Sequence, residues 1–455
     1  MLFNSFEFIF IFLPSVFFVY FGLIKLRFSK LSILFLAFAS LIFYSYYNVL
    51  YLPIILGSII FNYAISNIIN KNKKILFLGI TANLLLLGYF KYTNFLIQNI
   101  NYILDQNIQL VNIALPLAIS FFTFQQIAFL IDNYHNKKRY NFFDYTLFIS
   151  FFPQLIAGPI VHHKEMMPQF LNKNNLKINY ENISKAIYIF SIGLFKKVVI
   201  ADNLAIIAIN GFDNTQVDSV IAAWTTSLSY TFELYFDFSG YCDMAIGAAL
   251  LFNIKLPINF NSPYKSLNIQ EFWRRWHISL GKFLKDYVYM PLGGNKKKTP
   301  NTYFNLFAVF LLGGIWHGAG WGFIIWGTLH GLAQIFYRSS INIIKIPKII
   351  SWLITFLFIN TTWVFFRAKD FATATHIIKT MFGINANIGN FLDKKYEIIS
   401  IIICFIICIF MKNSNELTQN SSFRYKAAFF IATLIVITYI SSLSAKLSPF
   451  LYFNF

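Results

Sequence analysis

The sequence predicts an all-α integral membrane protein that crosses the bilayer many times. Of its 455 residues, 57% are hydrophobic and 20% aromatic, whereas only 12% are charged. Apolar stretches of the roughly 20 residues that a membrane helix needs follow one another almost from end to end. Because no long polar linker separates them, we expect one membrane-embedded domain over residues 1–455. This composition excludes a soluble enzyme.

The predicted membrane segments follow in chain order, with boundaries that are soft by a few residues. They are 8–24, 31–48, 50–69, 75–98, 111–134, 144–161, 184–210, 219–251, 302–317, 319–337, 349–366, 396–411 and 426–446. The first is a retained helix and not a signal peptide, because its flank MLFNSFE has no Lys or Arg. We expect 144–161 and 219–251 to be bent, re-entrant or split, and about 11 to 14 membrane segments in total.

The loops set the orientation, because Lys and Arg favour the cytoplasmic side. The loops 25–30, 70–74 and 135–139 are basic, whereas the N-terminus and the loop 99–109 are not. The N-terminus is therefore expected outside, and the three basic loops together with the basic loop 295–298 are expected inside. The net charge of +19 sits mostly in short loops, which suits anionic lipid head groups and does not require nucleic acid.

Residues 269–298 are predicted to begin with an amphipathic helix at the membrane interface. Aromatic and aliphatic residues recur there at helical spacing, between Arg274, Arg275 and two lysines, and PLGG ends the helix. Contact of these cations with lipid phosphate is the simpler interpretation. His277 lies in the tryptophan-rich part of this helix, where a lipid-contact role does not explain it.

Two carboxylates, Glu233 and Asp237, lie four residues apart and so share one face of a predicted helix. Carboxylates at membrane depth normally face a bundle interior or a wet cavity. A structural pairing with Arg274 or Arg275 and a direct ligand role both stay open.

His317 lies in the apolar stretch LLGGIWHGAGWGFIIWGTLHG, residues 311–331, and His330 follows thirteen positions later. The glycines beside His317 would let a helix or a narrow ligand approach closely. Neutral imidazole, with an unperturbed pKa of about 6.5, suits the deprotonation of a hydroxyl. These glycines and the two flanking tryptophans, Trp316 and Trp321, favour a functional histidine over a structural one.

No metal site is expected from the spacing of the potential ligands. Cys242, Cys404 and Cys408 form neither a CxxC pair nor a zinc pattern. His162 and His163 are neighbours, and adjacent residues on a helix point about 100° apart.

Seven ordered motifs together resemble the membrane-bound O-acyltransferase family, in particular its bacterial polysaccharide branch, and the PatA-type peptidoglycan acetylators most of all. The motifs are LPLAISFFTFQQIAFLID (115–132), FFPQLIAGPIV (151–161), GLFKKVVIADNLA (193–205), FDFSGYCDMAIG (236–247), FWRRWHISLGKFLKDYVYMPLGGN (272–295), LLGGIWHGAGWGFIIWGTLHG (311–331) and WVFFRA (363–368). This motif core covers residues 115–368.

The resemblance implies a bundle of helices around a central tunnel that carries an acetyl group from cytoplasmic acetyl-CoA. The family's invariant histidine falls on His317 and a second one on His277, which we expect to be the catalytic residues. His330 matches a further recurrent position. We expect four residues to support the catalytic histidines: His330, Asp237, Trp316 and Trp321. We expect three cations to bind the phosphates of coenzyme A: Arg274, Arg275 and Lys296. Acetyl-CoA is a donor substrate, and no tightly bound cofactor is implied.

Several functions stay open within and beyond this family. We favour O-acetylation of peptidoglycan on N-acetylmuramic acid, because the many Phe, Ile, Asn and Lys residues correspond to AT-rich codons, which suit an AT-rich Gram-negative host better than a GC-rich alginate producer. We expect a periplasmic SGNH-hydrolase-like partner to complete the transfer, because the sequence shows no soluble domain and no serine nucleophile elbow. Acetylation of alginate or another exopolysaccharide, and D-alanylation of teichoic acid, are alternatives. A transporter or flippase of lipid-linked sugars is the alternative outside the enzymes. The simplest alternative is a scaffold subunit that only anchors the periplasmic partner. General-base catalysis by His317 and a covalent acetyl-histidine are both open.

Overall fold

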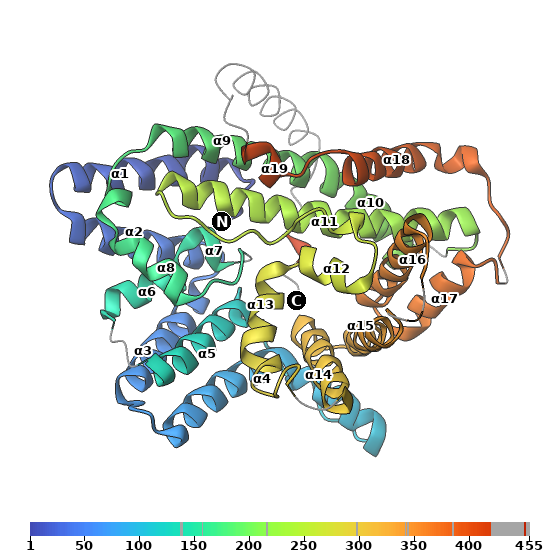
Figure 1. Ribbon diagram of the computed structural model, residues 1–455, viewed down its shortest axis with the longest axis horizontal. Coiled ribbons are helices and arrows are strands. Elements are labelled where there is room, and N and C mark those ends of the chain that lie inside the picture. The colour runs from blue at the N-terminus through green and yellow to red at the C-terminus, as the bar shows by residue number, and fades with distance from the viewer. Residues whose placement is uncertain are drawn as a thin grey trace. The chain divides into compact units, whose positions relative to one another are not determined.

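Most of the part of the chain that the computed structural model describes is helical (Figure 1). That part comprises residues 1–136, 140–156, 158–214, 217–296, 299–341, 343, 345–384, 386–419 and 450–451. Within these ranges there is no β-strand, only an isolated bridge between Ser219 and Asn387. The predicted all-α class is confirmed, whereas the predicted segment 426–446 lies outside the described residues.

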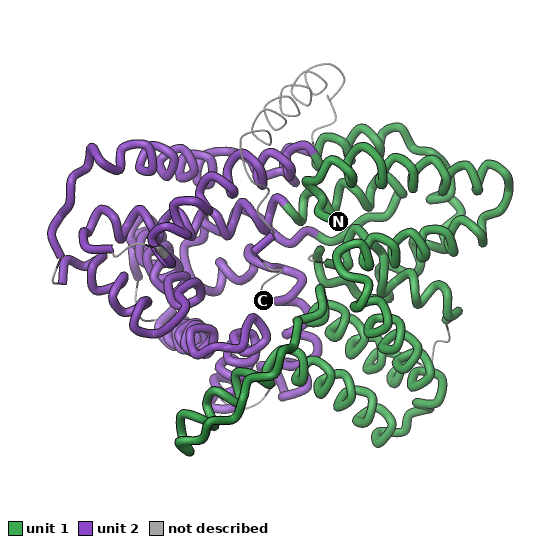
Figure 2. The backbone as a smooth tube through the Cα atoms, turned by 180° about the vertical axis from the view of Figure 1, so that it is seen from behind, with its two compact units in different colours: residues 1–190, 241–257 green, residues 191–240, 258–455 purple. Residues whose placement is uncertain are grey.

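The helices gather into two compact units, which are coloured separately in Figure 2. Unit 1 comprises residues 1–190 and 241–257, and unit 2 comprises residues 191–240 and 258–455. The single domain expected over residues 1–455 stays a prediction.

Unit 1 is built from the N-terminal helices and is held together by buried amides. Its helices are α1 (Leu13–Lys25), α2 (Ser29–Ser45), α3 (Leu52–Ile68), α4 (Lys73–Leu104), α5 (Ile119–Asn136), α6 (Phe142–Ser150), α7 (Phe152–Leu155), α8 (His163–Leu171) and most of α9 (Tyr180–Phe195). Asn62 Nδ2 of α3 donates to Gln126 Oε1 of α5 at 2.6 Å and to Asn83 Oδ1 of α4 at 3.1 Å. In lipid, the burial of apolar surface does not by itself drive helices together, so hydrogen bonds between side chains help to link them.

Unit 2 contains the motif-rich helices. They are α10 (Asp202–Ile209), α11 (Val220–Leu251, as far as Gly240), α12 (Ile269–Arg275), α13 (Ile278–Leu284), α14 (Thr299–His317), α15 (Trp321–Ser340), α16 (Lys348–Arg367), α17 (Phe371–Met381), α18 (Lys395–Phe410) and α19 (Ser414–Gln419). A π-helical turn, η4 (Lys196–Ala201), joins α9 to α10. Helices α14 and α15 cross closely: a Cβ on Gly314 would lie 3.0 Å from Gly327 Cα.

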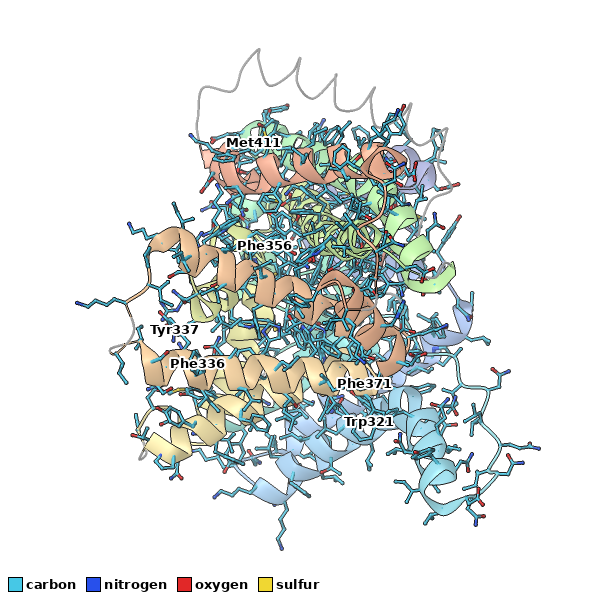
Figure 3. All side chains as sticks on the ribbon, turned by 90° about the vertical axis from the view of Figure 1, so that its right-hand side faces the viewer. Trp321, Phe336, Tyr337, Phe356, Phe371 and Met411 are labelled. Atoms are coloured by element: carbon cyan, nitrogen blue, oxygen red, sulfur yellow. The ribbon has the colours of Figure 1, made fainter. Side chains whose placement is uncertain are left out.

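Four helices among the described residues are long and apolar enough to cross a membrane. They are Glu7–Lys25, Val49–Ile68, Lys73–Leu104 and Lys348–Arg367. The protein is therefore a membrane protein, and the larger number of segments expected stays a prediction. Trp321, Phe336 and Phe371, labelled in Figure 3, are 59%, 66% and 57% exposed, as suits side chains that meet lipid.

Three predicted segments differ from the structure in detail. The segment 144–161 is split into α6 and α7, as expected, whereas 219–251 forms one continuous helix, α11, and is not split. The segment 111–134 becomes helical only at Ile119. The amphipathic helix predicted from residue 269 is broken at Trp276 and His277, between α12 and α13.

Candidate active site

His317 ends α14 inside an aromatic cage. Its side chain is 3% exposed, and its ring centroid lies 5.0 Å from that of Trp316 and 5.2 Å from those of Trp326 and Phe366. Trp326 belongs to α15 and Phe366 to α16, so three helices enclose this imidazole. Such an apolar enclosure excludes water and strengthens electrostatic interactions at the ring.

His277 lies beside His317 in the same unit, at the break between α12 and α13. The two ring centroids are 6.4 Å apart, and Phe238 of α11 packs edge-on against His277 at 4.8 Å. His277 is fully buried, and burial lowers its pKa to about 3, so the imidazole is neutral. The structure thus brings together the two histidines predicted to be catalytic.

His330 of α15 is held by hydrogen bonds at both ring nitrogens. Trp273 Nε1 donates to His330 Nδ1 at 3.1 Å, and His330 Nε2 lies 3.1 Å from Thr362 Oγ1. Because the Thr362 hydroxyl itself donates to Ile359 O at 2.9 Å, it accepts from His330 Nε2–H. His330 therefore fastens α12 and α16 to α15.

Two tryptophans that were not among the predicted site residues connect these histidines. Trp326 and Trp363 are each 1% exposed and stack with centroids 5.6 Å apart. Trp326 also lies 4.7 Å from His330 and 5.2 Å from His317, centroid to centroid. The sequence carried one signal for this contact: Trp326 lies four residues before His330, so the two side chains share a helix face.

Trp316 and Trp321, both predicted as supporting residues, differ in their surroundings. Trp316 is buried, and its ring centroid lies 6.3 Å from that of His277. Trp321 is the first residue of α15 and is 59% exposed, so it is not enclosed with the histidines.

Asp237 is buried in a charge cluster with a lysine. Lys197 Nζ lies 2.6 Å from Asp237 Oδ1 and 2.9 Å from Asp202 Oδ1, and Leu451 N donates to Asp237 Oδ2 at 2.9 Å. The counter-ion of Asp237 is therefore Lys197 and neither of the arginines Arg274 and Arg275. The interior position predicted for this carboxylate is confirmed.

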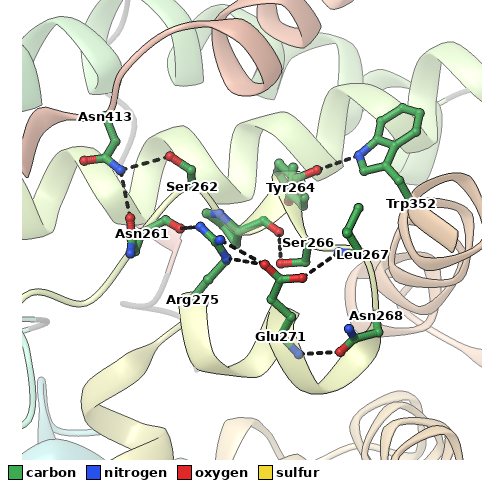
Figure 4. A network of polar contacts seen from close by, with 11 residues as sticks. Asn261, Ser262, Tyr264, Ser266, Leu267, Asn268, Glu271, Arg275, Trp352 and Asn413 are labelled. Carbon is green, nitrogen blue, oxygen red and sulfur yellow. Dashed lines mark hydrogen bonds and ion pairs between the residues drawn. The ribbon is translucent and has the colours of Figure 1, made fainter. Parts of the chain in front are cut away.

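The three cations predicted to hold coenzyme A phosphates have different surroundings. Arg275 Nε and Nη2 bind Glu271 Oε1 at 3.0 and 2.9 Å, and Arg275 Nη1 donates to Asn261 O at 3.1 Å (Figure 4). Arg275 thus ties α12 to the preceding loop. Arg274 and Lys296 are exposed.

Potential metal ligands are scattered across the described residues. No group of three His, Cys, Asp or Glu side chains there could hold a metal ion. His163 of unit 1 faces Asp132, with Nδ1 3.4 Å from Oδ2.

A family model described as the membrane-bound O-acyltransferase family matches residues 74–368, which include all three histidines of the site. The chain belongs to the membrane-bound O-acyltransferase family. It is 48% identical to a peptidoglycan O-acetyltransferase of Helicobacter pylori, over 100% of this chain and 98% of the relative. It is also 40% identical to a probable alginate O-acetylase of Pseudomonas aeruginosa, over 84% of this chain and 75% of the relative. A teichoic acid D-alanyltransferase of Bacillus subtilis is 29% identical over 57% of this chain and 70% of that protein.

Membership of the membrane-bound O-acyltransferase family identifies this protein as an acyltransferase enzyme. The resemblance found in the motifs over residues 115–368 is therefore confirmed. The roles assigned to His277, His317 and the basic residues stay predictions, now with the geometry described above.

Proposed function

We propose that this enzyme O-acetylates peptidoglycan, taking acetyl from cytoplasmic acetyl-CoA and delivering it across the inner membrane. The observation that carries the proposal is the 48% identity to a peptidoglycan O-acetyltransferase along both chains. Identity to the probable alginate O-acetylase is 40% and covers less of either chain. The acceptor is the hydroxyl of N-acetylmuramic acid, reached through a periplasmic SGNH-hydrolase-like partner.

His317 is the general base in this proposal. The neutral imidazole removes the proton of the attacking hydroxyl, and the hydroxyl oxygen forms a bond to the thioester carbonyl carbon. The C–S bond then breaks, and the leaving thiolate takes the proton from the imidazolium, which releases coenzyme A and restores the neutral base. Positioned proton transfer typically contributes about 10² to 10⁴-fold to a rate. The aromatic cage of Trp316, Trp326 and Phe366 supports this role because it fixes the ring and excludes water.

His277 orients the acyl group or the nucleophile beside His317. The exposed side chains of Arg274 and Lys296 bind coenzyme A phosphates at the inner face, where they remain accessible to a soluble donor. Arg275 contributes less, because Glu271 already neutralises its guanidinium. The N-terminus lies on the periplasmic side.

The experiment is the measurement of ester-linked acetate in a strain that lacks this chain. Peptidoglycan and secreted polysaccharide are purified from the deletion strain and from strains complemented with wild type, His317→Ala or His376→Ala. We expect peptidoglycan acetate to return with wild type and His376→Ala but not with His317→Ala. His376 is a matched control because it is exposed on α17, where its Nε2 lies 3.1 Å from the Val217 carbonyl oxygen.

Other outcomes would overturn the proposal in distinct ways. Loss of acetate from secreted polysaccharide alone would assign the enzyme to an exopolysaccharide. Full activity of a normally inserted His317→Ala enzyme would refute the catalytic base and favour a scaffold. Proteoliposomes that translocate intact lipid-linked sugar without acetyl transfer from labelled acetyl-CoA would identify a carrier.

A further inference from the structure

A short loop of unit 2, residues 259–261, clamps the helix break that carries His277. Ile278 N donates to Asn259 O at 3.0 Å, and Asn261 N donates to Arg275 O at 2.9 Å. These two bonds lie on either side of the break, and Arg275 Nη1 adds a third to Asn261 O at 3.1 Å. The loop therefore fixes the backbone that presents His277.

That backbone has an uncommon conformation. His277 has a φ of +45°, in the left-handed region that few residues other than glycine adopt. Such conformations persist only where the surroundings impose them, and they cluster at functional sites. The clamp supplies the constraint at His277.

The Asn259 side chain makes the decisive contacts and is 1% exposed. Its Oδ1 accepts from Ser279 N at 3.1 Å and from Ser279 Oγ at 2.9 Å, and it lies 3.2 Å from His277 Nδ1. A backbone N–H can only donate, so the amide atom that faces Ser279 N is the oxygen and not the nitrogen. An amide oxygen carries no proton, so His277 Nδ1 must donate to it.

The tautomer of His277 follows from these bonds. A neutral imidazole with its proton on Nδ1 has its lone pair on Nε2. We propose that Asn259 is a positioning residue that holds His277 as the Nδ1–H tautomer and so offers the Nε2 lone pair to the acyl-transfer site. This rests on the proposed function, in which His277 acts beside His317.

The test uses membrane vesicles that contain full-length enzyme and receive labelled acetyl-CoA, with ester-linked label in peptidoglycan as the readout. Asn259→Ala removes the acceptor, and we expect transfer to fall roughly 10- to 100-fold while the amount of inserted protein stays normal. Asn261→Ala is the matched control, because alanine keeps the backbone hydrogen bonds of the clamp and removes only a side chain that contacts Asn413 and not His277. We expect it to transfer acetyl like wild type.

Asn259→Asp separates positioning from folding. The carboxylate still accepts the same hydrogen bonds but stabilises the imidazolium, so the acid limb of the pH–rate profile should move to higher pH. A purely structural role for Asn259 would leave the profile in place and would overturn the proposal.

A double-mutant cycle with His277→Ala completes the design. If Asn259 acts through His277, adding Asn259→Ala to His277→Ala costs no further activity. A further loss in the double variant, or wild-type transfer by Asn259→Ala, would refute the proposal. Full activity of His277→Ala together with an inactive His317→Ala would also refute it, yet would leave the proposed acyl transfer standing.

Discussion

The crossing of α14 and α15 predicts opposite effects for two adjacent glycine substitutions. An alanine Cβ at Gly314 would lie 3.0 Å from Gly327 Cα and 3.2 Å from Gly327 N, and closer still to the Phe323 carbonyl oxygen. All three are backbone atoms, so no side chain can move aside. At Gly313 a Cβ would meet only Leu284 Cδ1, at 3.5 Å, which is ordinary contact.

The size of the effect of Gly314→Ala follows from how far the two helices would have to separate. Carbon atoms pack best at about 3.5–4.0 Å, so Gly314→Ala should push α15 away from α14 by about 1 Å. Overpacking of this kind costs about 1–3 kcal/mol, against a gain of about 0.5–1 kcal/mol for replacing a helical glycine. Because α14 ends in His317 and α15 carries Trp326, a shift of about 1 Å can cost about 10²-fold in rate.

The assay compares Gly314→Ala with Gly313→Ala for thermal unfolding in detergent and for acetyl transfer in membrane vesicles. We expect Gly313→Ala to retain wild-type activity and to gain about 0.5–1 kcal/mol of stability, whereas Gly314→Ala loses activity and does not gain stability. Equal activity and equal unfolding temperature for the two variants would refute the argument that backbone contact at Gly314 positions His317.

Three other substitutions test separate interactions. Lys197→Met should destabilise the protein by about 3–5 kcal/mol, because it leaves two buried carboxylates uncompensated. Lys185→Met, which breaks an exposed pair with Glu181, should leave the unfolding temperature nearly unchanged. His330→Phe should cost about 1–3 kcal/mol in detergent unfolding, because Trp273 Nε1 loses its acceptor, and His330→Gln should recover part of this. Asp370 caps α17, and the Thr373 backbone N–H lowers its pKa, so Asp370→Ala should cost about 1 kcal/mol in unfolding. That cost should be present above pH 4 or so and vanish as the carboxylate is protonated in more acidic buffer.

Local sequence predicted much of the candidate site. The spacing of apolar runs predicted the helical class, and the glycines around His317 predicted a close helix approach, which occurs at Gly314. These features depend on residues that are near one another in the chain. The proximity of His277 to His317 came from the family resemblance and not from spacing.

The features that sequence did not predict depend on distant partners. The apolar spacing of Phe272, Trp276 and Leu280 continues across the break at His277, so periodicity alone predicts an unbroken helix. At the break, Asn259 and Asn261 form hydrogen bonds with the backbone on either side of His277. Nothing local to Asp237 indicates Lys197, forty positions earlier, as its counter-ion, because charge patterns do not report which helices meet.

The ion pair of Lys197 with Asp202 has a consequence for insertion into the bilayer. The two residues span the π-helical turn η4, whose closing hydrogen bond runs from Asp202 N to Lys197 O, so they can enter lipid already paired. Separately inserted charges would each cost about 2.5–3.5 kcal/mol at the centre of a helix. Asp237 on α11 has no such local partner and gains its counter-ion only when α11 meets η4. Stable integration of α11 therefore depends on the earlier arrival of the segment that carries Lys197.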